Sequence, residues 1–131
     1  MRVLLDTHVL LWALIDADRL PAELRAALAD RSHHVMFSAV NIWEVAIKKA
    51  LREADFDFSP SDVAEAARAA GFAELPVSAE HAARVFALEP LHSDPFDRLL
   101  IAQALCEPAR LLTADRAVSR YNAPIDLMVP Q

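Results

Sequence analysis

The sequence predicts an α/β fold, a three-layer α/β/α sandwich whose central sheet of four to five strands is mainly parallel. Two observations predict it. Short apolar runs typical of strands alternate with longer runs typical of helices through most of the 131 residues. The first apolar run, residues 3–5, lacks polar alternation, as in a strand that is covered on both faces. Right-handed crossovers would then join the parallel strands.

The individual elements follow from local patterns along the chain. Helices are expected where apolar residues recur at helical spacing or where a capping residue or a proline opens a run: residues 9–15, 21–30, 39–51, 60–71, about 78–87, and a helix that begins at residue 95. Strands are expected at short apolar runs: residues 3–5, 34–37, 72–77, 110–115 and 125–129. Residues 52–59 are expected to form a loop. We expect one domain over residues 1–131, in which the helices over about 60–71 and 78–87 form a covering hairpin.

Composition excludes several classes of protein. The one cysteine, Cys106, allows neither a disulfide framework nor a thiolate metal cluster, and a reducing cytoplasm fits. The one glycine, Gly71, cannot build a phosphate loop, a dinucleotide-binding turn or a nucleophile elbow. We expect no signal peptide and no membrane span, because the apolar runs are too short. The apolar content of 55% suggests that part of an apolar face meets a partner or a second copy.

The net charge of −6 argues against broad electrostatic binding of nucleic acid. A local site is still compatible with it. If carboxylates gather around divalent cations, the acidity is confined to that place, and the eleven arginines remain available to line a phosphate track.

Two acids stand at the start of the helix that begins at Pro95. Asp94 is placed as the N-cap, and Pro95 occupies the first helical position, where its missing N–H is not needed. Asp97 falls in the first turn, where the helix dipole favours a charged carboxylate. Taken alone, both acids are explained by helix capping, so their role depends on the other acids of the chain.

Three further acids map to the same edge of the predicted sheet. Asp6 and Asp115 each follow a strand, and Glu44 lies in the helix after the second strand. Ligands of open α/β sheets bind at this carboxyl edge. Glu44 also has an alternative, a solvent-facing position paired with Lys48 one turn later.

Four or five carboxylates in one place need cations or protonation. Each close pair repels by about 4 kcal/mol at an effective dielectric constant of about 20. Oxygen ligands without a cysteine or a paired histidine motif favour Mg²⁺ or Mn²⁺ over zinc. Such a site suits phosphodiester hydrolysis, because bound ions activate a water and stabilise the leaving oxygen, so that no side chain has to act as the nucleophile.

Four motifs, in this order and spacing, resemble those of PIN-domain ribonucleases, and above all those of the VapC-type toxins of bacterial toxin-antitoxin pairs. They are Asp6-Thr7-His8 after an apolar strand, Ser-x-x-Asn-x-x-Glu from Ser38 to Glu44, Asp-Pro-Phe-Asp-Arg-Leu-Leu-Ile-Ala-Gln-Ala from Asp94, and Leu-Leu-Thr-Ala-Asp ending at Asp115. The resemblance runs from residue 3 to about residue 127, which is essentially the whole chain.

The resemblance implies a Mg²⁺-dependent endoribonuclease of the cytoplasm, with Mn²⁺ as a substitute, that is inhibited by a small antitoxin. Such proteins are usually dimeric, and a toxin-antitoxin hetero-oligomer is a further option. The acids that match the catalytic and metal-holding quartet are Asp6, Glu44, Asp97 and Asp115. Asp94 matches an additional acid, either a metal ligand through water or the helix cap. The small polar residues that match positions orienting ligands or water are Thr7, Ser38 and Thr113.

Two alternatives differ in kind from a nuclease. A response-regulator receiver also has an acidic pocket at this edge, but it needs adjacent acids after the first strand and a lysine after the last. Here Asp6 stands alone, and no lysine follows Lys49. A catalytically silent module that binds a metal or a partner through the same acids stays open.

Histidine and tryptophan side chains near these motifs are expected to be structural. His8 and His92 lie close to the acids in the sequence and could touch RNA, but we expect a structural or solvent-facing role. Trp12 and Trp43 could stack on bases, but we expect them to pack in the core, because they lie in apolar helices.

Overall fold

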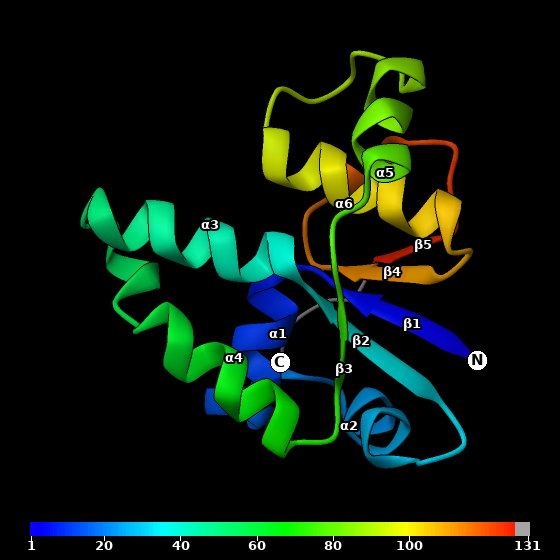
Figure 1. The fold of residues 1–131 in the computed structure, drawn as a ribbon. Coiled ribbons are helices and arrows are strands. Elements are labelled where there is room, and N and C mark those ends of the chain that lie inside the picture. The colour runs from blue at the N-terminus through cyan, green and yellow to red at the C-terminus, as the bar shows by residue number, and fades with distance from the viewer. Residues whose placement is uncertain (128–131) are drawn as a thin grey trace.

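The computed structural model describes residues 1–127 and contains a five-stranded parallel sheet (Figure 1). The strands are β1 (Arg2–Leu5), β2 (His34–Ser38), β3 (Ala73–Leu75), β4 (Arg110–Thr113) and β5 (Ile125–Leu127), in the order β3-β2-β1-β4-β5. All four strand pairs are parallel. The predicted α/β class and its parallel sheet are therefore confirmed. Met128 and Val129, which belong to the last predicted strand, lie outside the described residues.

Six α-helices lie between the strands of this part of the chain. They are α1 (Thr7–Ile15), α2 (Ala22–Ala29), α3 (Ala39–Ala50), α4 (Pro60–Ala69), α5 (Ala79–Arg84) and α6 (Pro95–Cys106). Five of them begin after a residue whose side chain accepts a hydrogen bond from a backbone N–H of the first turn: Asp6, Ser38, Ser59, Ser78 and Asp94. Over residues 1–127, no helix combines the length and the apolar character that a bilayer-spanning segment needs.

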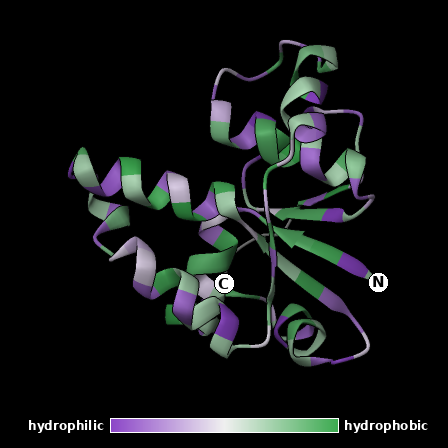
Figure 2. Ribbon diagram, in the orientation of Figure 1, coloured by the Kyte–Doolittle hydropathy of each residue, from purple (hydrophilic) through white to green (hydrophobic). Residues whose placement is uncertain are grey.

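Two apolar layers cover the two faces of the sheet. Val3 and Leu5 of β1 pack with side chains of α1, α3 and α4. Leu4, which lies between them in the sequence, packs with side chains of α6. Successive residues of a strand point to opposite faces, so β1 is buried from both sides. Figure 2 shows β1 as hydrophobic along most of its length.

The predicted hairpin of the helices over 60–71 and 78–87 is wrong. α4 packs against α1 and α3, whereas α5 packs against α6, on the opposite side of the sheet in Figure 1. The strand order explains the separation. The crossovers β1 to β2 and β2 to β3 run outward in one direction, and the crossover β3 to β4 runs back. Since both kinds of crossover are right-handed, their helices lie on opposite faces.

Candidate metal centre

Asp6 is a buried acid at the carboxyl end of β1. Its Oδ1 atom accepts a hydrogen bond from the backbone N–H of Val9 (2.9 Å), so the carboxylate caps α1. Its Oδ2 atom accepts a hydrogen bond from the hydroxyl of Thr113, the last residue of the neighbouring strand β4. The parallel sheet thus brings together two residues that are 107 positions apart in the chain.

Glu44 of α3 is the most deeply buried of the predicted acids, at 3% exposure. Its Oε1 atom accepts a hydrogen bond from the hydroxyl of Thr7 (2.6 Å), and its Oε2 atom accepts one from Lys48 Nζ (2.6 Å). The alternative of a solvent-facing glutamate is therefore wrong, although the expected pairing with Lys48 is present. Asn41 donates a hydrogen bond to the Thr7 hydroxyl (3.1 Å) and so helps to orient it toward Glu44.

Asp94 and Asp97 stand at the N-terminus of α6. Asp94 Oδ1 accepts hydrogen bonds from the backbone N–H groups of Phe96 (2.8 Å) and Asp97 (3.1 Å), so Asp94 is the helix cap. Its Oδ2 atom lies 4.0 Å from Lys48 Nζ. Asp97 Oδ2 lies 2.8 Å from His92 Nε2. His92, Asp94 and Asp97 each offer one ligand atom, and these atoms lie within 4.8 Å of one another, a spacing that one metal ion can bridge.

Asp115 lies at the rim of this acidic cluster, with 47% of its side chain exposed. Its Oδ1 atom accepts a hydrogen bond from the backbone N–H of Ala117 (2.8 Å), and its Oδ2 atom lies 3.9 Å from His92 Nε2. The backbone N–H of Asp115 donates to the Thr113 hydroxyl (3.0 Å), which itself donates to Asp6. One threonine at the end of β4 therefore links the rim acid to the buried one.

Burial and mutual repulsion raise the pKa of two of these acids. The pKa of Asp6 is raised from its usual 3.8 to about 6, first by burial and also by the charge of Glu44. The pKa of Asp97 is also raised to about 6, by burial and by three neighbouring carboxylates, chiefly Asp94, against the effect of the hydrogen bond with His92. The cluster therefore carries more negative charge than its own partners stabilise.

The donor set fits a hard divalent cation. Carboxylate oxygens predominate, and these are the ligands that Mg²⁺ and Mn²⁺ prefer. The expected oxygen-only set gains one imidazole nitrogen from His92, a ligand type that also suits transition metals such as Zn²⁺ and Fe²⁺. A cation would relieve the repulsion that raises the two pKa values.

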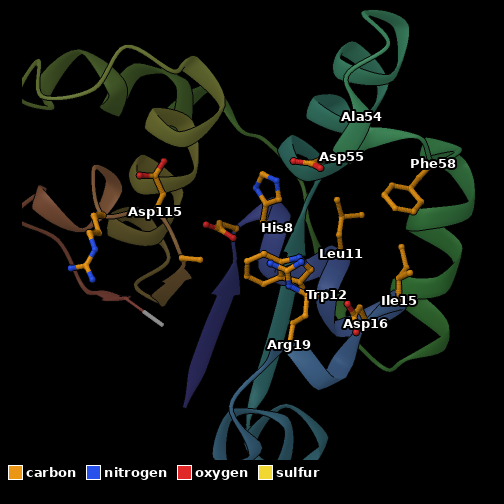
Figure 3. A pocket seen from close by; sticks show the side chains of 13 residues that line it. His8, Leu11, Trp12, Ile15, Asp16, Arg19, Ala54, Asp55, Phe58 and Asp115 are labelled. Atoms are coloured by element: carbon orange, nitrogen blue, oxygen red, sulfur yellow. The ribbon is translucent and has the colours of Figure 1, made fainter. Parts of the chain in front are cut away.

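A cavity of about 790 Å³ opens beside the acidic cluster. Asp6 and Asp115 form part of its lining, together with aromatic and cationic side chains: His8, Trp12, Arg19, Phe58 and Arg116. Figure 3 shows His8 and Trp12 of α1 between Asp115 on one side and Phe58 on the other. A substrate in this cavity would lie next to the acids.

Ser38 does not contact the acids directly. It is fully buried, caps α3 through the N–H of Val40 (2.9 Å) and donates its hydroxyl proton to Gln103 Oε1. Its backbone N–H donates to Asn41 Oδ1 (2.7 Å), and only through Asn41 does Ser38 reach Thr7. Thr7 and Thr113, by contrast, each donate a hydrogen bond to one of the predicted acids.

Two charged or titratable side chains in the cluster were not predicted as part of it. His92 was expected to be structural or solvent-facing, but it contacts Asp97. Its position two residues before the helix cap Asp94 is the one local signal that could have indicated this. Lys48 appeared only as a surface partner of Glu44, but its ammonium also lies near Asp94.

Trp43 was expected in the core and is instead 48% exposed, with its ring against Phe96 (4.6 Å between ring centroids).

Comparison with known proteins agrees with this architecture. The family model of the PIN domain matches residues 3–124. One similar solved structure is that of VapBC2 from Rickettsia felis, which is bound to a DNA fragment from the VapBC2 promoter. The similarity covers 97% of this chain and 98% of that chain, with a TM-score of 0.72 and 15% identity. DNA-bound VapBC from Salmonella typhimurium gives a TM-score of 0.68 at 14% identity, over 96% of this chain and 97% of that chain. VapBC-1 from nontypeable Haemophilus influenzae gives 0.65 at 15% identity, over 97% and 98%. The comparison with curated proteins gave no match.

Proposed function

Because the chain belongs to the PIN-domain family, we propose that it is a metal-dependent endoribonuclease that hydrolyses RNA phosphodiester bonds. The observation that carries this proposal is the convergence of Asp6, Glu44 and Asp97 in one largely buried cluster with an excess of negative charge. Such an excess is costly to the fold unless protons or a cation neutralise it, and near neutral pH a cation is the stronger candidate.

The proposed catalytic acids are Asp6, Glu44, Asp97 and Asp115, which would hold Mg²⁺ or, as a substitute, Mn²⁺. A bound ion would lower the pKa of a coordinated water and stabilise the charge that develops on the phosphate. Thr7 and Thr113 orient two of the acids by their hydrogen bonds. Asp94 caps α6 and adds to the negative potential of the site.

RNA is the proposed substrate because the cavity beside the acids offers groups for both its bases and its phosphates. Arg116 and Arg19 line the cavity and are exposed. Arg19 lies over the ring of Trp12, 4.6 Å from its centroid. Aromatic and arginine side chains together form the kind of surface on which single-stranded bases stack. The net charge of −6 is then no obstacle, because phosphate contacts would be local.

The direct test is RNA cleavage by the purified protein with Mg²⁺ and with a chelator. We expect cleavage by the wild type with Mg²⁺, no cleavage with the chelator, and a loss of more than about 100-fold in Asp6→Asn, which removes one charge from the site at nearly constant shape. Asp55→Asn is the matched control, since Asp55 lines the same cavity but is not a hydrogen-bond partner of Asp6. Equal cleavage by wild type and Asp6→Asn would contradict the proposal. Metal binding without cleavage would support a catalytically silent binding module instead.

We further propose that the protein acts in the cytoplasm as the toxin of a toxin-antitoxin pair. Its resemblance to VapC-type toxins and its fold likeness to VapBC proteins support this. An exposed apolar stripe on and after α3 supports a protein partner, either a second copy in a homodimer or the antitoxin in a hetero-oligomer: Trp43, Ile47 and Leu51. Light scattering of the purified chain would measure its oligomeric state, and a strict monomer would contradict the homodimer.

A further inference from the structure

Lys48 places a positive charge inside the acidic cluster. Its Nζ atom donates a hydrogen bond to Glu44 Oε2 (2.6 Å) and lies 4.0 Å from Asp94 Oδ2. The side chain is only 19% exposed, in contrast to that of Lys49, which is 42% exposed and pairs with the surface residue Asp57 (3.0 Å). These are the two lysines of the chain, and only the first reaches the acids.

Aromatic rings hold this ammonium group in place. Lys48 Nζ lies 4.8 Å from the ring centroid of Phe56 and 5.8 Å from that of Phe96. Both distances fall within the range of cation–π attraction. Burial alone would lower the pKa of Lys48, but the hydrogen bond and charge of Glu44, with the charge of Asp94, raise it. The side chain is therefore a fixed, charged group and not a mobile surface lysine.

Lys48 and a divalent cation would act on the same carboxylate. Both oxygens of Glu44 already accept hydrogen bonds, one from Thr7 and one from Lys48. A cation at the acids would meet the ammonium as a like charge in a partly buried setting, where charges interact more strongly than in water.

We propose that Lys48 is a tethered cation of the acidic cluster, which neutralises Glu44 and Asp94 when no divalent ion is bound and weakens divalent binding when one arrives. This inference rests on the proposed function, since it takes the acids to be a metal site. It makes Lys48 a positioning residue that acts through Glu44. It also means that the metal affinity of the site is set by a side chain that is not a ligand.

The experiment is a calorimetric titration of the purified protein with Mn²⁺ at low ionic strength, for the wild type and four variants. We expect Lys48→Met and Lys48→Gln to bind Mn²⁺ about tenfold more tightly, because a like charge has been removed. Lys48→Arg keeps the charge and should bind as the wild type does. Lys49→Met changes the net charge by the same amount at the neighbouring position and should also leave the affinity unchanged.

Thermal melting of the same proteins gives a second readout that needs no activity. Without metal, Lys48→Met and Lys48→Gln should melt below Lys49→Met, since Glu44 and Asp94 lose their counter-ion. Saturating Mn²⁺ should then raise their melting temperature by more than it raises that of the wild type. If Lys48→Met does not fold, Lys48→Gln makes the same change in charge and can still donate a hydrogen bond.

The outcomes separate this inference from the proposed function. If the wild type binds Mn²⁺ and both neutral variants bind it equally or more weakly, Lys48 is only a structural ion pair and the inference is overturned. If the wild type binds no divalent ion at all, the metal-dependent nuclease itself is contradicted.

Discussion

Two buried polar clusters are built on α6, and they differ in how they are completed. The cluster near the C-terminus of the helix centres on Gln103, whose side chain accepts a hydrogen bond from Ser38 and donates to Pro76 O (3.2 Å) and His81 Nδ1 (3.3 Å). His81 Nε2 pairs with Glu107 (2.6 Å). Donors and acceptors match here within the protein.

The acidic cluster at the helix N-terminus is not balanced in this way. Five carboxylates face one ammonium group and one imidazole, and two of the acids have a raised pKa. Carboxylates that repel one another in a partly buried place are costly unless a proton or a cation neutralises them, so the acidic cluster has charge that the chain itself does not balance. The comparison teaches that the fold itself satisfies the Gln103 cluster, whereas the acidic cluster retains charge that a cation could neutralise, as the proposed function requires.

The largest effect is expected from Asp97→Asn. It should reduce RNA cleavage by more than about 100-fold and abolish the rise in melting temperature that Mg²⁺ produces in the wild type. The fold should persist, because the change removes a repelled charge and not a packing contact. Cleavage assays and melting curves with Mg²⁺ or a chelator measure both effects. If the variant still cleaves RNA at the wild-type rate, Asp97 is not a catalytic acid. The acidic cluster would then be structural, as the Gln103 cluster is.

Gln103→Leu should lower the stability of the fold and leave the response to Mg²⁺ unchanged. It leaves the Ser38 hydroxyl without its acceptor and His81 without one of its donors, so the free energy of unfolding should fall by about 3 kcal/mol. Urea denaturation with a chelator measures this loss. At a temperature where the variant remains folded, Mg²⁺ should still raise its melting temperature as in the wild type. A loss of Mg²⁺ response in the folded variant would show that the clusters are coupled.

The pH dependence of stability should reveal the unbalanced acids. A raised pKa means that the folded state of Asp6 and Asp97 binds protons more tightly than the unfolded chain, so protonation stabilises the fold and that gain is lost as the pH rises through about 6. Without metal, the free energy of unfolding should therefore be higher at pH 5 than at pH 7, by about 1 kcal/mol for each carboxyl.

Denaturation curves at the two pH values, with Mg²⁺ and with a chelator, test this sign. Mg²⁺ should reduce the difference, because it competes with the protons. The window stays above pH 5, since Glu107 and Asp126 have a pKa lowered chiefly by His81 and Arg110 and lose stabilising pairs in more acidic solution. A lower free energy of unfolding at pH 5 than at pH 7, measured with the chelator, would contradict the raised pKa of Asp6 and Asp97.

Ser38→Ala should have the smallest effect and decides which cluster Ser38 serves. It removes the cap of α3 and the hydrogen bond to Gln103, at a cost of about 1 kcal/mol in the free energy of unfolding. Because Ser38 contacts no acid, the affinity for Mg²⁺ should not change. A weakened affinity, measured by calorimetry, would support the role that the resemblance implied for Ser38, which is to orient ligands or water at the acids.

Much of the fold was predictable because its signals are local. The apolar run before Asp6 and the capping of α6 by Asp94 depend on residues within about one turn of each other, and both are present as expected. The convergence of Asp6 and Asp97 at the carboxyl edge followed from the parallel sheet. Local signals could not show whether α4 and α5 pack together as a hairpin, because this depends on the strand order.

The sequence by itself determined the order of the helices and strands and that acids stand at the ends of the strands, because capping and apolar periodicity operate between near neighbours. Only the tertiary structure decided that Lys48 reaches Asp94 and that Trp43 stays exposed, with its ring against Phe96. Both contacts join α3, which follows β2, to the segment between β3 and β4. Their geometry is set by strand order and by helix packing across the sheet, which no local pattern encodes.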